Sequence, residues 1–109
     1  MVSTREEALK LAARTRQELA GIYGPRLRGV YLFGSAARDE LNQDSDIDIA
    51  IILDDIVDRF AEIQRTSDLG SKISLDAGIL VTFLFIPEAD YQQGKYTIYR
   101  EVKGEGLAV

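Results

Sequence analysis

The spacing of apolar residues at the start of the chain predicts an amphipathic helix. Alanine, leucine and isoleucine recur at helical spacing across residues 3–22, with arginine and glutamate between them. Ser3 or Thr4 can cap the first turn together with a glutamate three residues further on. The glycines and the proline of residues 21–25, GIYGP, should end the helix.

Three apolar runs further along the chain predict β-strands. Residues 27–33, LRGVYLF, and residues 79–86, ILVTFLFI, are rich in aromatic and branched side chains, and a proline stops the second of these runs. Residues 46–53, DIDIAIIL, predict a strand that is buried on both faces beyond its first turn. A helical turn near residues 96–102 and a short strand at residues 106–109 would complete the chain.

A second long helix is expected between the second and third of these strands. Asp54 or Asp55 would cap its start, and Gly70 with Ser71 would loosen its end. Its inward face is predicted to consist of four apolar residues: Ile56, Val57, Phe60 and Ile63.

The order of the elements predicts a small mixed β-sheet of about three to four strands flanked by helices, an α/β or α+β fold. The chain has 109 residues and shows no repeat, low-complexity segment or linker. We therefore expect residues 1–109 to form a single domain.

Composition limits the chemistry that such a domain can perform. The chain has no cysteine and no histidine, which excludes a disulfide framework, a thiolate zinc site and the usual general base. A metal would have to be held by oxygen, which favours a hard cation such as Mg²⁺. The net charge of −5 argues against extended binding to nucleic acid. No apolar run suits a membrane span and the start lacks a secretory segment, so we expect a cytoplasmic protein.

The stretch FGSAARDELNQDSDIDIAI, residues 33–51, places two carboxylates where a buried strand begins. Side chains alternate faces along a strand, so Asp46 and Asp48 share one side while the isoleucines between and after them fill the other. Their Cα atoms would lie roughly 6.6 Å apart, close enough for both carboxylates to converge on a cation. Without a cation, the two charges would repel each other and lose solvation. This arrangement favours a metal site.

A Gly-Ser pair in the same stretch provides a candidate anion-binding turn. Gly34 would let the backbone approach a ligand closely, and the N–H groups after Ser35 would face an anion at the start of a short helix. Carboxylates that hold Mg²⁺ opposite such a turn suit a nucleoside triphosphate. Taken singly, a Gly-Ser pair is usually only a turn, and an Asp-x-Asp is usually a cap. A calcium loop lacks its glycine here, and a Walker loop lacks its lysine.

The combination of these motifs resembles the nucleotidyltransferase superfamily of DNA polymerase beta. Gly34-Ser35 is followed after ten residues by Asp46-x-Asp48 and an apolar strand, and Arg38 lies between them. The similarity is closest to the minimal nucleotidyltransferase branch of small stand-alone domains, in which the ending YREVKGEGLAV is also common. The resemblance implies the nucleotidyltransferase fold and two Mg²⁺ ions. It also implies attack of an acceptor hydroxyl on the α-phosphorus of a nucleotide, usually ATP, with loss of pyrophosphate.

The resemblance also implies roles for individual residues. Asp46 and Asp48 would ligate the metals, while Gly34 and Ser35 would cradle the β- and γ-phosphates. Arg38 would neutralise phosphate or dock a partner, and the alternative is a surface arginine paired with one of the two acids that follow it.

One departure from the family concerns a third acid on the following strand, which orients or deprotonates the acceptor. Aligning residues 79–86 with that strand puts Thr82 at the expected position, and a threonine replaces neither a carboxylate ligand nor a base. Asp76 has the right parity if the strand begins early, so it is the candidate third catalytic acid. Its alternative role is that of a turn residue before Gly78.

The resemblance finally implies a partner. Minimal domains of this branch are typically paired with a small helical protein of the HEPN type, a ribonuclease-like toxin, and act as its antitoxin, in some cases by adenylylating a tyrosine. We therefore expect a nucleoside triphosphate, and a HEPN-type protein or a second copy of the chain, as partners. Three hypotheses follow: transfer of AMP to a protein hydroxyl, a catalytically weak module that neutralises its partner by binding, and a free-standing enzyme that modifies a small molecule.

Overall fold

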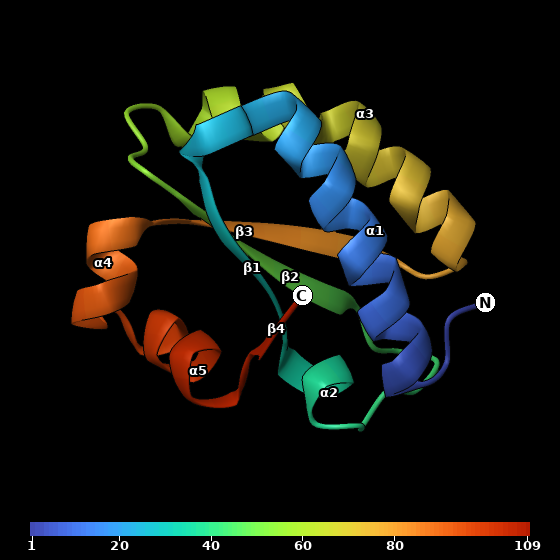
Figure 1. The fold of residues 1–109 in the computed structure, drawn as a ribbon. Coiled ribbons are helices and arrows are strands. Elements are labelled where there is room, and N and C mark those ends of the chain that lie inside the picture. Colours follow the sequence, from blue (N-terminus) through green and yellow to red (C-terminus); the bar gives the residue numbers. More distant parts are fainter.

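A four-stranded sheet lies between two groups of helices in the computed structural model, which describes residues 1–109 (Figure 1). The strand order is β3-β2-β1-β4. Strand β1 runs antiparallel to both of its neighbours, and β3 runs parallel to β2. The predicted small mixed sheet is thus confirmed, with strands β1 (Leu27–Phe33), β2 (Ile47–Leu53), β3 (Val81–Pro87) and β4 (Leu107–Ala108).

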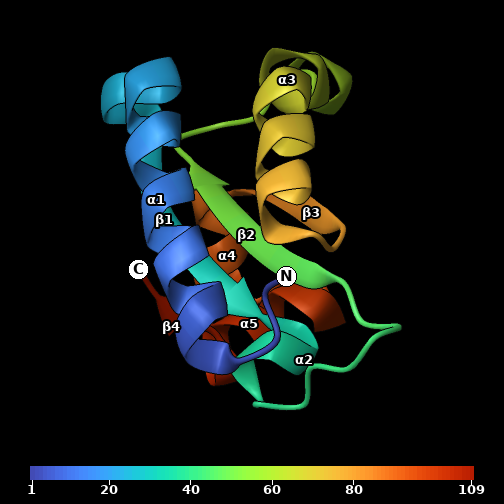
Figure 2. The same ribbon diagram turned by 90° about the vertical axis from the view of Figure 1, so that its right-hand side faces the viewer.

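Helices α1 (Arg5–Tyr23) and α3 (Arg59–Ala77) cover one face of the sheet (Figure 2). The cap of α1 is Thr4, whose hydroxyl accepts the backbone N–H of Glu7. The first helix was therefore predicted well, and a short 3-10 helix (Gly24–Arg26) follows it. No helix of the structure combines the length and the apolar character that a membrane crossing requires.

The inward face predicted for α3 is wrong for most of its members. Val57, Phe60 and Ile63 are 95%, 63% and 49% exposed, and only Ile56 packs partly against the core. The helix starts later than expected because Asp58 caps it by accepting two backbone N–H groups. It then runs without a break through the predicted weak point, and its buried face consists of Glu62, Thr66, Leu69, Ile73 and Ala77.

Strand β2 divides the interior into two hydrophobic clusters. Its isoleucines at odd positions and Leu53 pack with α1 and α3 on one side. Ala50 and Ile52 point to the other side, where they pack against Tyr99 and Val102. The predicted alternation along this strand is therefore confirmed, and Asp48 belongs by its position to the second side.

The second side of the sheet is covered by α4 (Glu88–Gln93) and α5 (Thr97–Glu105) (Figure 1). Helix α5 and β4 lie close to the places where the sequence predicted a helical turn and a final strand. The connection from β1 to β2 begins with α2 (Gly34–Ala37), a single turn at the end of β1. This turn and the start of β2 bring the Gly-Ser pair and the two aspartates to one end of the sheet (Figure 2).

Candidate metal and nucleotide site

Asp48 lies near the start of β2, in the middle of the sheet. In the strand register it pairs with Phe33 of β1 on one side and with Thr82 of β3 on the other. The Thr82 hydroxyl donates a hydrogen bond of 2.8 Å to Oδ1 of Asp48, and both residues are half-buried. Thr82 thus lies beside Asp48, at the position where the family resemblance implies a third acid.

Gly34 approaches the same carboxylate from the other side. It has a φ of +70°, a conformation that side chains rarely adopt. A Cβ atom built on Gly34 would collide with Oδ2 of Asp48. Only a glycine therefore lets the turn after β1 come this close to the aspartate. The structure brings together Gly34 and Asp48, and Ser35 follows, half-buried, as the next residue of the turn.

Asp46 stands directly before β2 and is exposed. Neither Asp46 nor Asp48 has a cationic partner, because the six ion pairs of the chain join other residues. No three acidic side chains lie close enough together to hold a metal ion by themselves. Mg²⁺ is commonly held by one or two carboxylates together with phosphate oxygens and water. The two aspartates therefore fit Mg²⁺ that is shared with a phosphate ligand.

Arg38 is engaged on the surface beside this turn. Its guanidinium donates to Glu40 and to Glu105 of α5, each at 3.3 Å. These hydrogen bonds raise the pKa of the Arg38 side chain above its ordinary value. The pairing with Glu40 agrees with the alternative of a surface ion pair. The sequence offered no indication of Glu105, which follows Arg38 by 67 positions.

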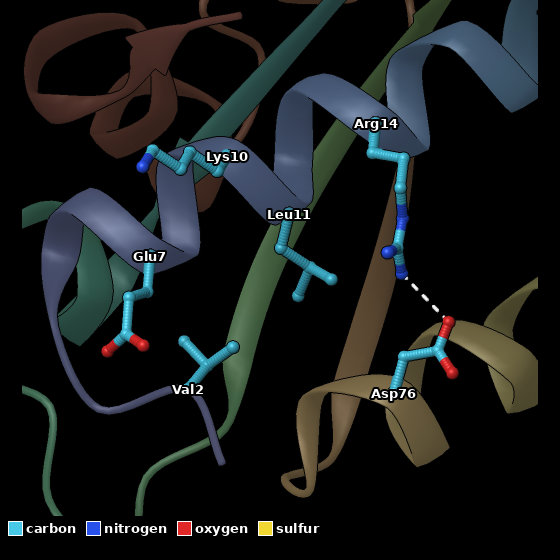
Figure 3. A pocket seen from close by; sticks show the side chains of 6 residues that line it. All are labelled: Val2, Glu7, Lys10, Leu11, Arg14 and Asp76. Atoms are coloured by element: carbon cyan, nitrogen blue, oxygen red, sulfur yellow. Dashed lines mark hydrogen bonds and ion pairs between the residues drawn. The ribbon is translucent and has the colours of Figure 1, made fainter.

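The structure does not bring Asp76 to the other predicted site residues. Residues 59–77 form one helix, and β3 begins only at Val81, so the strand does not start early enough to include Asp76. Its carboxylate accepts a hydrogen bond of 2.8 Å from Arg14 of α1 (Figure 3). The hollow around this ion pair lies between α1 and α3, on the side of the sheet opposite Asp48, and is lined by Val2, Glu7, Lys10, Leu11, Arg14 and Asp76.

The candidate site lies apart from the five main hollows of the surface, none of which is lined by Asp46, Asp48 or Gly34. What the chain contributes is a carboxylate pair and a glycine turn at one end of the sheet.

Comparison with protein families gives the class that this geometry suits. A family model described as polymerase beta, nucleotidyltransferase matches residues 19–103, a span that contains the Gly-Ser pair and both aspartates. The chain belongs to this nucleotidyltransferase family.

One curated relative is the protein adenylyltransferase MntA of Shewanella oneidensis. It is 34% identical over 56 residues, which make up 51% of this chain and 40% of that protein. The chain therefore spans about two fifths of the length of the relative in this match.

Solved structures share the fold at low sequence identity. A protein of Sulfolobus solfataricus classed with the nucleotidyltransferases superposes with a TM-score of 0.65 at 23% identity, covering 95% of this chain and 80% of that one. A toxin–antitoxin complex with AMP-PNP superposes with a TM-score of 0.62 at 23% identity, and the match covers 87% of this chain and 69% of that chain. A third structure shows the tri-AMPylated HEPN toxin of Shewanella oneidensis in complex with the MNT antitoxin. Its TM-score is 0.51 at 20% identity, and the match covers 89% of this chain and 70% of that chain.

Proposed function

We propose that residues 1–109 act as one nucleotidyltransferase domain that transfers AMP from ATP to a hydroxyl group of a partner protein. The observation that carries the proposal is the Asp48 carboxylate, which lies against Gly34 without a cationic partner. Membership of the nucleotidyltransferase family supports the reaction class. The relative named as a protein adenylyltransferase supports AMP as the transferred group and a protein as the acceptor.

In this proposal, Asp46 and Asp48 hold Mg²⁺, and the turn at Gly34 and Ser35 contacts the β- and γ-phosphates. The cation would neutralise charge on the phosphates while the acceptor attacks. The acceptor oxygen forms a bond to the α-phosphorus, the bond to pyrophosphate breaks, and the proton of the hydroxyl leaves to solvent. The chain contributes mainly position and charge compensation, since it has no histidine and Thr82 is not a base.

The proposed partner is a small helical HEPN-type toxin for which this chain serves as antitoxin. The solved complex of an AMPylated HEPN toxin with its antitoxin supports this pairing. In this proposal, the partner or a second copy of the chain supplies walls around the bound nucleotide, because none of the five main hollows of the chain includes the site. A reaction that uses ATP fits a protein of the cytoplasm.

Labelled transfer tests the proposal. The purified chain is mixed with α-labelled ATP, Mg²⁺ and a HEPN-type protein that forms a complex with it. We expect label on the partner with the wild type and with Asp76→Asn, and none with the double variant Asp46→Asn/Asp48→Asn. Absence of label from the wild-type reaction, under conditions where the two proteins form a complex, contradicts the proposed transfer.

A second candidate function is neutralisation by binding alone. The observation that favours it is Thr82 at the place of a third acid, with no acidic group of three elsewhere. It predicts that the Asp46→Asn/Asp48→Asn variant still protects cells that express the toxin. Loss of protection by this variant, while its complex with the toxin persists, counts in favour of transfer.

A further inference from the structure

Thr82 makes the one hydrogen bond that the structure records for the Asp48 carboxylate. Its hydroxyl donates to Oδ1 across 2.8 Å, from the neighbouring strand and the paired register position. A hydrogen bond from a hydroxyl to a carboxylate is about twice as strong as one between neutral groups. Threonine is also stiff at χ1, because its Cβ carries two heavy atoms, so the donor itself is held in place.

The second oxygen of Asp48 lies close to the turn after β1. A Cβ atom built on Gly34 would collide with Oδ2, so the glycine leaves room for the carboxylate at this point. The carboxylate thus lies between β3, which holds Oδ1 by a hydrogen bond, and the turn after β1. The terminal torsion of an aspartate is otherwise broad, so a free carboxylate would sample many orientations.

We propose that Thr82 is a positioning residue, whose hydroxyl orients the Asp48 carboxylate so that Oδ2 stays directed to the Gly34 turn for a divalent cation. The proposal rests on the proposed function, because it concerns the cation of that same site. Groups that hydrogen-bond a ligating carboxylate fix its orientation, and their loss commonly weakens metal binding.

The choice of threonine at this position has a second consequence. A carboxylate at position 82 would face Asp48 directly across two paired strands, and like charges in this arrangement destabilise a sheet. Thr82 gives up a metal ligand, but it keeps the metal-free site ordered. With Thr82, the Asp48 carboxylate keeps its orientation without a metal. With an acid at position 82, two carboxylates would face each other, and the folded site would depend on a bound cation for its stability.

Two substitutions separate the hydroxyl from the shape of the side chain. Thr82→Val keeps the branched shape and removes the donor, and Thr82→Ser keeps the donor. Mn²⁺ is the probe, and its binding is followed by the loss of the free-ion signal in electron paramagnetic resonance. We expect Thr82→Val to weaken Mn²⁺ binding by roughly 10- to 100-fold and Thr82→Ser to restore it. Equal affinity of the wild type and Thr82→Val overturns the proposal.

A metal-free measurement keeps this inference separate from the proposed function. Crystal structures of the metal-free wild type, Thr82→Val and Thr82→Ser report both side-chain torsions of Asp48, including the terminal torsion that sets the direction of its carboxylate. We expect one carboxylate orientation in the wild type and in Thr82→Ser, and a changed or multiple orientation in Thr82→Val, with thermal unfolding as the check that each variant folds. Several carboxylate orientations in the wild type, or the wild-type orientation retained in Thr82→Val, overturn the role of Thr82. A wild type that holds Asp48 fixed but binds no Mn²⁺ contradicts the proposed function instead.

Discussion

The two ends of β2 hold carboxylates in opposite ways. Beyond its C-terminal end lies Glu62 of α3, whose side chain is only 5% exposed and accepts hydrogen bonds from Tyr23, Arg26 and Arg65. Near its N-terminal end lies Asp48, which has a single hydroxyl donor and no cation. The charge of Glu62 is satisfied by the chain itself. The charge of Asp48 is left for something outside the chain.

Glu62, near the C-terminal end of β2, has a structural role. Burial alone would raise the pKa of Glu62, but the hydrogen bonds from Arg26, Tyr23 and Arg65 outweigh burial and hold the pKa below 4.5. Burial, followed by the hydrogen bond to Glu62, raises the pKa of Tyr23 to about 12. These contacts fasten the start of α3 to the end of α1. An ion network that closes on itself therefore indicates folding, whereas an unpaired carboxylate beside a glycine turn indicates ligand binding.

The largest effect is expected from Asp48→Asn. An amide keeps the shape and can still accept from Thr82, but it cannot offer charge to Mg²⁺. We expect transfer of AMP to fall by at least about a hundredfold, the size of loss seen when one transition-state contact is removed. The free energy of unfolding should change by less than about 1 kcal/mol, because the amide oxygen can still accept the hydrogen bond from Thr82. Labelled transfer and urea unfolding measure the two quantities, and a large loss of stability would mean that Asp48 is a structural acid.

A smaller effect on function, with a cost in stability, is expected from Gly34→Ala. The new Cβ meets Oδ2 of Asp48, and the positive φ costs on the order of 1–3 kcal/mol for a residue with a side chain. Gly24→Ala is the matched control, because Gly24 has a φ of +56° and no atom within 4 Å of the added Cβ. Both variants should lose stability, but only Gly34→Ala should weaken Mn²⁺ binding. Equal Mn²⁺ binding by the two variants would argue against contact between the turn and the cation site.

Near the C-terminal end of β2, Glu62→Gln should reduce the free energy of unfolding and leave the site at Asp48 and Gly34 intact. The amide keeps one acceptor oxygen and replaces the other by a donor, so at least one of the two arginines loses its acceptor and both lose the charge, at a cost of about 1–3 kcal/mol. A lowered pKa in the folded state means that Glu62 contributes stability above pH 4.5, and that this contribution is lost as the pH falls through the folded-state pKa. The difference in unfolding free energy between the wild type and Glu62→Gln should therefore shrink below pH 4.5. A difference that stays constant from pH 7 to pH 3 contradicts this account.

The smallest effect is expected from Asp76→Asn. The ion pair with Arg14 is about half exposed on both sides, and pairs of this kind contribute less than about 1 kcal/mol. Mn²⁺ binding and AMP transfer should equal those of the wild type, because Asp76 lies on the other side of the sheet. A loss of transfer without a loss of stability would return Asp76 to the catalytic residues.

The contrast between the two ends also explains what the sequence could reveal. The candidate site residues Gly34, Asp46 and Asp48 lie within 15 positions of one another in the sequence. Strand alternation and a glycine turn, which are local patterns, are therefore enough to group them. Glu62 could not be recognised as buried, because its partners Tyr23 and Arg26 precede it by 39 and 36 positions. The orientation of α3 depends on these distant contacts and on the cap at Asp58. For this reason, apolar spacing alone placed the wrong residues inward.

The position of Thr82 was predicted, but its hydrogen bond was not. Alignment of residues 79–86 with the corresponding strand of the family gives the position of Thr82, whereas the direction of its hydroxyl depends on a side-chain rotamer that only the three-dimensional structure fixes. Asp76 shows the converse error. Strand parity does not apply to Asp76, because the helix continues past the Gly-Ser pair at positions 70–71 and ends only at Ala77.

The central claim is that Asp48, near the N-terminal end of β2, binds Mg²⁺ together with a nucleotide. Titration of ATP into the chain with and without Mg²⁺ tests this claim most directly, and calorimetry and the shift in melting temperature report the binding. A ligand that binds only the folded state raises its stability in proportion to the logarithm of its concentration over the dissociation constant. The account predicts binding that requires Mg²⁺, that persists in Asp76→Asn and Glu62→Gln, and that is lost in Asp48→Asn. Binding of Mg²⁺-ATP by Asp48→Asn with the affinity of the wild type would contradict it.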